Sequence, residues 1–252
     1  MITSWDGDLL DMPLRDQTRE LAIHVQVIIN AAGKTDLAWC ETNPLEAFRS
    51  NVQGALHAAR VARKVGATFI HFSSGCVWDG PYHESGRGFL PTDPVSPAAF
   101  YTWTKATADA LIQHEFPEAH ILRPRQVFSG SQNPRNTLQK FLRYEALLDT
   151  PNSMTSSYTI IRAVKTLIQK PYPGRIWNLY DRGNVTPFEV GQYLHRQGLR
   201  GAPQKLSKAE LDAFHKPKRV DTVLEDPVAE AYFKPYQIAE TLSRAVEELR
   251  KS

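Results

Sequence analysis

Tyr101 and Lys105 are the residues whose types and spacing most directly suggest chemistry. They lie four residues apart in the segment 99–116, whose pattern predicts a helix that ends before Pro117. Residues four apart share one face of a helix, so an ammonium group would stand beside a phenol. We expect this ammonium to lower the pKa of Tyr101 by favouring the phenolate. Such a tyrosine can exchange a proton with a carbonyl or alcohol oxygen near neutral pH.

Two serines, Ser73 and Ser74, follow the apolar run 67–72. The hydroxyl of Ser74 could hold the same oxygen that Tyr101 protonates. With Lys105, these groups would form a site for moving a hydride on or off carbon, and a nicotinamide would supply the hydride. Each motif also has a simpler interpretation. A single Tyr-x-x-x-Lys match can arise by chance among nine tyrosines, and paired serines often form a turn or a helix cap.

Strands and helices alternate along the first half of the chain. Apolar runs predict buried strands, and amphipathic patterns predict helices between them: strands at 25–30, 67–73 and 119–128, helices at 43–65 and 99–116. This order predicts an α/β fold, a Rossmann-like doubly wound parallel sheet. Ligands of such sheets bind at the carboxyl ends of the strands. Those ends carry Asn30, the serine pair and residues 125–128.

The second half of the chain is richer in helical patterns. Helices are predicted at 136–148, 158–170, 186–198 and 235–251, and a strand at 174–180. We therefore expect a Rossmann-like dinucleotide-binding domain over residues 1–130. A smaller, mostly helical substrate-binding lobe is expected over residues 131–252, interleaved with the first domain.

The composition is that of an ordinary globular protein. Of 252 residues, 42% are hydrophobic and 23% are charged, and the net charge of +3 is spread without a basic stripe. Without a basic stripe, neither a nucleic-acid partner nor an anionic membrane surface is expected. No run of about 18 apolar residues occurs, so no membrane span is expected. The two cysteines lack metal-ligand spacing, so no metal site is expected. The polar, acidic first residues are unlike a signal peptide, and a cytoplasmic location is expected.

The residues around these motifs resemble a known family. The stretch "VIINAAGKTDLAWCE", the segment "NPLEAFRSNVQGALHAARVARKVGATFIHFSSGCVWDG" and "YTWTK" are similar to extended short-chain dehydrogenases/reductases. The resemblance is to the dTDP-4-dehydrorhamnose reductase branch, which acts on sugar nucleotides. It covers about residues 6–130. It continues weakly through "RIWNLYDRGNVTPFEVGQYL" and "HKPKRVDTVL", which resemble that branch's substrate lobe.

The resemblance implies a role for each matching residue. Ser74 matches the catalytic Ser/Thr, Tyr101 the acid/base, and Lys105 its pKa-lowering partner and ribose contact. Asn51 matches a helix position near the proton-relay end of the site, although a structural hydrogen bond is an equally good interpretation. The implied substrate is a nucleotide sugar, and the implied cofactor is NAD or NADP. The residues implied to contact the cofactor are Ala31, Ala32, Gly33, Asn51, Ser73, Tyr101, Lys105 and Arg125.

The sequence also departs from the family pattern. It has no Gly-x-x-Gly-x-x-Gly, the motif whose glycines let a pyrophosphate approach a helix N-terminus. Residues 1–11 resemble the family's second strand, so the first strand–helix unit is expected to be absent and the sheet to have a gap. Either the sheet is reorganised, or another chain fills the gap, or cofactor binding was lost with the unit. A homo-oligomer or a partner protein that completes the sheet is therefore expected.

Three functional hypotheses follow. The first is an NAD(P)-dependent reductase or epimerase of a nucleotide sugar. The second is a non-catalytic regulatory or scaffold relative that has lost dinucleotide binding. The third is a truncated reading frame.

Smaller departures concern the substrate: Thr102 replaces a glycine, Gln126 a tryptophan, and Gly75 with Cys76 an Asp-Tyr pair.

Overall fold

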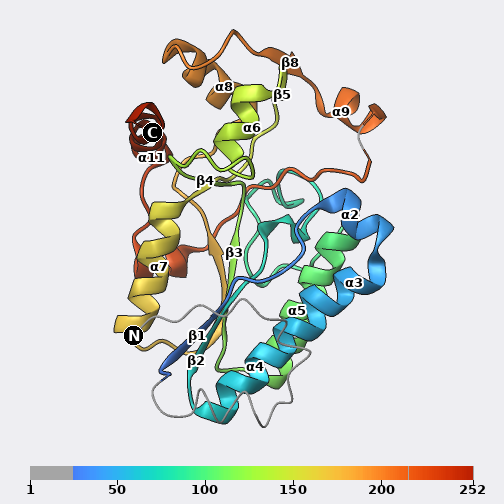
Figure 1. Ribbon diagram of the computed structural model, residues 1–252, viewed down its shortest axis with the longest axis vertical. Helices are drawn as coiled ribbons and strands as arrows, with labels where there is room; N and C mark the ends of the chain where they lie inside the picture. Colours follow the sequence, from blue (N-terminus) through green and yellow to red (C-terminus); the bar gives the residue numbers. More distant parts are fainter. Residues whose placement is uncertain (1–24, 215, 252) are drawn as a thin grey trace.

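A four-stranded parallel sheet forms the centre of the protein. The computed structural model describes residues 25–214 and 216–251 (Figure 1). The strands lie in the order β1-β2-β3-β7. They are β1 (Val27–Asn30), β2 (Thr68–Phe72), β3 (His120–Pro124) and β7 (Arg175–Leu179). The predicted α/β fold with a parallel sheet is confirmed, whereas the expected strand within residues 1–11 lies outside the described residues.

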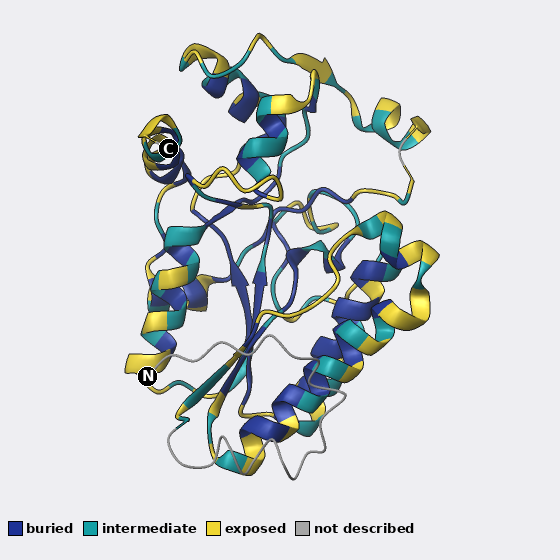
Figure 2. Ribbon diagram, viewed as in Figure 1, coloured by how far each residue is buried: buried dark blue, intermediate teal, exposed yellow. Residues whose placement is uncertain are grey.

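Helices cover both faces of this sheet. One face packs against α4 (Gly54–Val65) and α5 (Phe100–Glu115), and the other against α7 (Ser157–Gln169) and α10 (Pro227–Phe233) (Figures 1 and 2). Neighbouring strand residues point to opposite faces, so Phe69 joins the first core and Ile70 the second. Burial on both sides explains why the strands are continuous apolar runs.

The predicted helix 43–65 is built from three pieces. It begins with α3 (Pro44–Phe48), continues through a π-helical turn (Arg49–Gln53), and ends with α4 at Gly66. A short helix, α2 (Leu37–Thr42), precedes it and is capped by Asp36. Single π-helical turns inside helices are frequent at functional sites because they re-aim one side chain.

A second lobe lies beyond the carboxyl ends of the strands (Figure 1). It has its own core, in which Phe128, Leu138, Leu147, Leu194 and Leu242 are buried. Its helices are α6 (Thr137–Arg143), α8 (Pro187–Arg196), α9 (Lys208–Phe214) and α11 (Ile238–Lys251). Two pairs of short parallel strands complete it, β4 (Val127–Phe128) with β6 (Thr155–Ser156) and β5 (Ala146–Leu148) with β8 (Gln204–Leu206).

Two predicted elements end earlier than expected. The helix predicted at 136–148 stops at Arg143, and Ala146–Leu148 instead forms β5, which buries Leu147 and Leu148. A short apolar run fits a helix or a strand equally well, and pairing with β8 decided between them. The strand predicted at 119–128 also divides, because β3 belongs to the main sheet while β4 pairs with β6.

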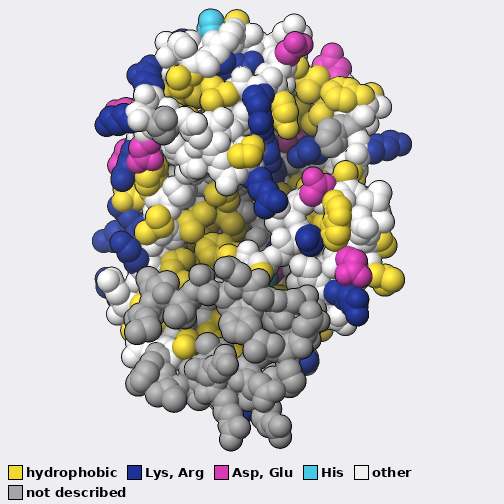
Figure 3. Space-filling view, in the orientation of Figure 1, with side chains coloured by type: hydrophobic (Ala, Val, Ile, Leu, Met, Phe, Trp, Pro, Cys, Tyr) yellow, Lys and Arg dark blue, Asp and Glu magenta, His cyan; other side chains and the backbone are white. Residues whose placement is uncertain are grey.

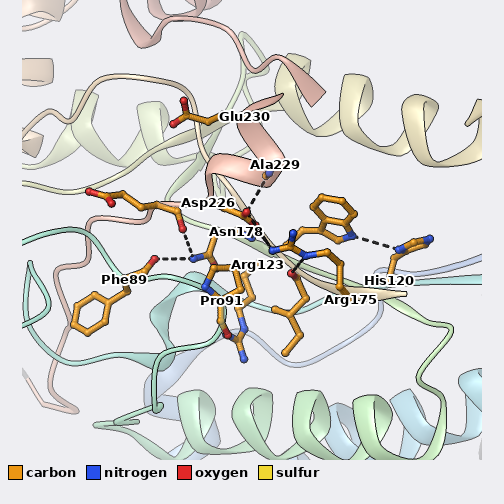
Figure 4. A network of polar contacts seen from close by, with 12 residues as sticks. Phe89, Pro91, His120, Arg123, Arg175, Asn178, Asp226, Ala229 and Glu230 are labelled. Atoms are coloured by element: carbon orange, nitrogen blue, oxygen red, sulfur yellow. Dashed lines mark hydrogen bonds and ion pairs between the residues drawn. The ribbon is translucent and has the colours of Figure 1, made fainter. Parts of the chain in front are cut away.

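A buried polar network fastens α10 to the sheet (Figure 4). The carboxylate of Asp226 accepts hydrogen bonds from Arg175 at 3.0 Å and from the backbone N–H of Ala229 at 3.0 Å. Asn178 donates to the carbonyl of Phe89 at 2.8 Å. These contacts join β7 to the loop after β2 and to the segment before α10.

None of the helices among the described residues is both long enough and apolar enough to cross a membrane. The division into two domains at residue 130 stays a prediction. Strand β7 and helix α7 come from the second half of the chain but pack in the main sheet layer.

The left-handed residue that ends α10 offers a stability test. Lys234 is exposed and has φ +51°, a conformation that costs a residue with a Cβ about 1–2 kcal/mol. We expect Lys234→Gly to stabilise the protein by about 1 kcal/mol, measured by urea unfolding. Gly198 ends α8 at φ +72° with open space around it, so Gly198→Ala should be destabilising by a similar amount. Unchanged midpoints for both variants would contradict the assignment of strain.

Candidate active site

The loops that follow β1, β2 and β3 meet at the edge of the sheet that faces the second lobe (Figure 1). This is the edge at which parallel α/β sheets bind ligands. The space-filling view shows a hollow on this side of the molecule, with hydrophobic side chains on its floor and Lys and Arg side chains along its upper rim (Figure 3).

The loop after β1 presents an exposed backbone. Ala31, Ala32 and Gly33 are all exposed. Asn30 shapes the start of the loop, because its Oδ1 accepts from the N–H of Ala32 at 3.1 Å and its Nδ2 donates to His71 at 3.1 Å. A Cβ at position 33 would lie 2.9 Å from the Oδ1 of Asn51, so the close approach requires glycine there.

Asn51 clamps this loop to helix α5. It lies on the π-helical turn, where it is buried. Its Oδ1 accepts from the N–H of Lys34 at 2.7 Å, and its Nδ2 donates to the carbonyl of Lys34 at 2.9 Å and to Thr104 at 3.0 Å. Both ends of the amide are therefore engaged, which supports the structural interpretation of Asn51. Contact with a cofactor stays a prediction for this residue.

The two serines after β2 have different surroundings. The Ser74 hydroxyl oxygen accepts from the N–H of Cys76 at 3.1 Å and caps the 3₁₀ turn Gly75–Val77. The Ser73 hydroxyl is buried without a partner among the described residues, while its N–H donates to Leu122 at 2.7 Å. A buried hydroxyl that lacks a partner is available to a ligand.

Tyr101 and Ser74 come together, as the sequence predicted. Both are buried, and a side-chain hydrogen bond with Ser74 lowers the pKa of Tyr101. Burial nevertheless outweighs this effect, and a Coulombic contribution from Cys76 also raises the pKa, so the pKa of Tyr101 lies well above its ordinary value.

The expectation of a lowered pKa for Tyr101 is therefore wrong for this structure, because burial dominates. Burial lowers the pKa of Lys105 from 10.5 to about 8, only partly offset by Asp109. The ammonium thus loses its proton at a lower pH than the phenol, and no positive charge remains beside Tyr101 when the phenol titrates. At neutral pH Lys105 is still mainly protonated, and its Nζ donates to the carbonyl of Phe72 at 2.7 Å.

Arg125 joins the site to the second lobe. Its guanidinium donates to the sulfur of Cys76 at 2.9 Å, to Asn152 at 2.8 Å and to the carbonyl of Val220. It is buried, and only its Nε lacks a partner among the described residues. These contacts favour a structural role, and contact with a cofactor stays a prediction for Arg125.

The departures at positions 75 and 126 have visible structural consequences. A Cβ at Gly75 would lie 2.8 Å from Leu224 and 3.3 Å from Arg125, so this packing leaves no room for an aspartate. Gln126 has φ +41° between β3 and β4, and its buried Oε1 has no partner among the described residues. Left-handed backbone costs a glutamine free energy that an asparagine or glycine would largely avoid.

A cavity of about 650 Å³ opens beside the start of α5. Its size suits a small ligand. Glu41, one of its lining residues, accepts a hydrogen bond from the N–H of Phe100 at 2.7 Å. Phe100 immediately precedes Tyr101, so the cavity wall is tied to the start of the helix that carries Tyr101. Ser74 and Tyr101 do not line it. The lining residues are Ala38, Glu41, Thr42, Ala98, Asp212, Lys216, Pro217 and Lys218.

Two residues of the site were not singled out from the sequence. The hydroxyl of Thr104 donates to the carbonyl of Tyr101 at 2.7 Å and accepts a hydrogen bond from Nδ2 of Asn51 at 3.0 Å. Asp109 lies one helical turn beyond Lys105 and acts on the pKa of both Lys105 and Tyr101. The spacing Tyr101, Lys105, Asp109 was a signal for the second residue, since all three fall on one helix face.

A parallel sheet covered by helices on both faces is a Rossmann-like fold, and Ser74, Tyr101 and Lys105 come from elements that meet at its carboxyl edge. A family model described as the RmlD substrate binding domain matches residues 6–217. Because this is most of the chain, the protein belongs to that family.

One named relative is similar over part of its length. A bifunctional dTDP-4-dehydrorhamnose 3,5-epimerase/dTDP-4-dehydrorhamnose reductase from Arabidopsis thaliana is 33% identical over 171 residues, 65% of this chain and 56% of that protein. The chain therefore spans about half the length of this curated relative.

Solved structures show the same fold. The L780 UDP-rhamnose synthase from Acanthamoeba polyphaga mimivirus has a TM-score of 0.84 and 21% identity, covering 97% of this chain and 89% of that one. A dTDP-4-dehydrorhamnose reductase from Bacillus anthracis str. Ames, in complex with NADP, has a TM-score of 0.76 and 17% identity, covering 95% and 83%.

The buried ammonium of Lys105 should cost the protein stability. A pKa lowered from 10.5 to about 8 corresponds to a penalty of about 3 kcal/mol at pH 7. We expect Lys105→Met to be more stable than the parent by about 1–2 kcal/mol at pH 7, since the lost bond to Phe72 offsets part of the gain.

The advantage should depend on pH in a defined direction. Between pH 8 and 10.5 the unfolded chain holds this proton while the folded parent has released it, so the parent gains stability as pH rises. The difference between Lys105→Met and parent should therefore shrink towards pH 10.5 in urea unfolding. Exposed Lys165 on α7 provides the control, and Lys165→Met should change little at any pH. A Lys105→Met difference that is independent of pH would contradict the buried charge.

Proposed function

We propose that the protein is an NAD(P)H-dependent reductase, or an epimerase of the same class, that acts on a nucleotide-linked sugar. A 4-keto-6-deoxy sugar on dTDP or UDP is the substrate type that the named relatives suggest. The observation that carries the proposal is the pairing of the Ser74 and Tyr101 hydroxyls beside the buried ammonium of Lys105.

The proton chemistry suits reduction of a ketone, which requires a hydride at carbon and a proton at oxygen. A bound nicotinamide supplies the hydride. The raised pKa of Tyr101 keeps its phenol protonated at neutral pH, so it can act as the general acid. Ser74 can donate a second hydrogen bond to the same oxygen, and the charge of Lys105 stabilises the phenolate that develops as the proton leaves.

The residues present fit the nicotinamide half of a dinucleotide. Polar groups at the carboxyl edge of the sheet come from the exposed residues 31–33 and from the hydroxyl of Ser73, which has no partner among the described residues. The 650 Å³ cavity lined by Glu41 and Ala98 offers room for the nucleotide part of the substrate. The sequence has no Gly-x-x-Gly-x-x-Gly, so other groups would have to contact the pyrophosphate.

The proposal includes a setting and a partner. Cys40 and Cys76 are free thiols, which supports a reducing, cytoplasmic environment. Among residues 25–214 and 216–251, β1 pairs only with β2, and Ile29 of β1 is 45% exposed. A strand edge whose backbone groups have no partner among the described residues supports association with a second copy or with another protein.

Removal of the Tyr101 hydroxyl tests the catalytic assignment. Tyr101→Phe should reduce turnover of a dTDP- or UDP-linked 4-keto-6-deoxy sugar by about 10²–10⁴-fold, because no other group is assigned to transfer the proton. Ser74→Ala should be milder, and Tyr144→Phe should match the parent, since Tyr144 is exposed in the second lobe. Turnover by Tyr101→Phe at the parent rate would overturn the assigned role.

Dinucleotide binding distinguishes the enzyme from the scaffold alternative. Calorimetric titration of the parent with NADH and NADPH should show binding of at least one. Gly33→Val should weaken it, because the side chain would collide with Asn51 and displace the loop. A parent that binds neither dinucleotide at millimolar concentration would favour a non-catalytic regulatory or scaffold protein.

Association can be measured separately from activity. We expect light scattering at increasing protein concentration to report a mass above that of a monomer, or a companion protein to co-purify with the chain. A monodisperse monomer over a wide concentration range would count against the partner proposal.

A further inference from the structure

The buried face of α5 continues past the two residues assigned to chemistry. Tyr101, Lys105 and Asp109 are spaced four residues apart and are 8%, 5% and 1% exposed. Residues at this spacing stack along one side of a helix, so a carboxylate, an ammonium and a phenol follow one another in a single buried row. The proposed reaction uses only the first two of these groups.

Asp109 is held by an ion pair that leaves half of its carboxylate free. The Nε of Arg123 on β3 donates to Oδ2 of Asp109 at 2.7 Å, and both side chains are almost wholly buried. The Oδ1 of Asp109 is buried and has no partner among the described residues. Arg123 is itself fixed, since it donates to the carbonyl of Pro91 at 3.4 Å (Figure 4). Its guanidinium also lies over the ring of Trp78, 4.9 Å from the ring centroid.

Among the charged and titratable groups around Lys105, Asp109 is the one that raises the pKa of Lys105. From β2, the carbonyl of Phe72 accepts a hydrogen bond from Lys105, and His71 is neutral because burial and Lys105 itself hold the His71 pKa well below 6.5. From α5, Tyr101 is protonated and Asp109 is the acid that raises the pKa of Lys105 against the effect of burial. From β3, Arg123 forms an ion pair with Asp109.

Arg123 makes this arrangement workable. A lone carboxylate in the interior would take up a proton and lose its charge. The charge-assisted bond from Arg123 compensates Oδ2 of Asp109, while Oδ1, which has no partner among the described residues, is left on the buried helix face that also carries Lys105. The same negative charge also raises the pKa of Tyr101 and so favours the protonated phenol.

We infer that Asp109, fixed by Arg123, is a positioning residue that keeps Lys105 charged behind Tyr101 in the proposed reaction. The inference rests on the proposed function for its purpose but not for its measurement. Lys105, with a pKa of about 8, is mainly charged at pH 7, and loss of the neighbouring carboxylate would move that balance towards the neutral amine.

The direct test is titration of Lys105 in the unliganded protein. Lysines labelled with ¹³C at Cε are followed by NMR across pH 5–11, and the Lys105 signal is assigned as the one missing from Lys105→Met. We expect a midpoint near 8 in the parent and a midpoint lower by at least one pH unit in Asp109→Asn, which keeps the side-chain shape. A Lys105 midpoint that is the same in both proteins would overturn the inference.

A second variant protects the test against misfolding. Asp109→Asn leaves Arg123 as an unpaired buried charge, and breaking such pairs can unfold a protein. The double variant Asp109→Asn with Arg123→Met removes both charges and should fold. It should show the same lowered midpoint, and a parent-like midpoint in the double variant would again overturn the inference.

A second buried ion pair supplies the matched control. Asp226 is 1% exposed and pairs with Arg175 at 3.0 Å on the other side of the sheet (Figure 4). Asp226→Asn should destabilise the protein comparably but leave the Lys105 midpoint at its parent value. A shift of the Lys105 midpoint in Asp226→Asn would show that general loosening, and not Asp109, controls the titration.

Activity adds an independent measurement. In Asp109→Asn, kcat/KM should begin its alkaline decline at a pH at least one unit lower than in the parent, and Asp109→Glu should restore the parent profile. If the parent shows no turnover, the proposed function fails while the NMR titration still decides the role of Asp109. If the parent is active and the midpoint does not move, only the inference fails.

Discussion

The hydrogen bond from the buried ammonium of Lys105 to the carbonyl of Phe72 joins helix α5 to the end of β2. It holds Lys105 of the helix against Phe72 at the carboxyl end of the strand. Ser74 follows Phe72 by two residues, and Tyr101 precedes Lys105 by one helical turn, so their hydroxyls meet because these two elements are locked together. Parallel pairing of β2 with β3, and of β3 with β7, then fixes where this point lies in the sheet.

Two side-chain amides extend this arrangement to the neighbouring elements. Asn51 uses both ends of its amide to hold the loop after β1 and Thr104 of α5. Asn152 accepts from Arg125 at 2.8 Å and donates to Asp221 at 2.8 Å, so the end of β3 is tied to the second lobe. Each amide serves several elements at once. Loss of either would therefore disturb the site without removing a group that takes part in the chemistry.

The site concentrates charges that water would otherwise stabilise. Lys105, Asp109 and Arg123 are all at least nine-tenths buried, and together they carry one net positive charge. Burial shifts the pKa of Lys105 down and the pKa of Tyr101 up, which separates the two titrations. A protonated phenol beside a charged amine is the state from which a proton can be given to a developing alkoxide. Burying the charge of Lys105 costs folding stability, as is common at sites that are selected for binding or chemistry and not for stability alone.

The sequence by itself determined the elements that depend on local pattern. The strands β1, β2, β3 and β7, the helix α5 and the placement of Tyr101 and Lys105 on one face follow from apolar periodicity, which local geometry imposes. Only the tertiary structure decided what depends on contacts distant in the chain. It turned residues 146–148 into a strand paired with β8, it engaged Arg125 with Asn152 and Val220, and it raised the pKa of Tyr101 where the helix spacing alone had predicted a decrease. The reason is physical: a pKa depends on how far a group is removed from water. That burial arises from segments such as β2, α2 and the loop after β2, which no spacing within one helix reveals.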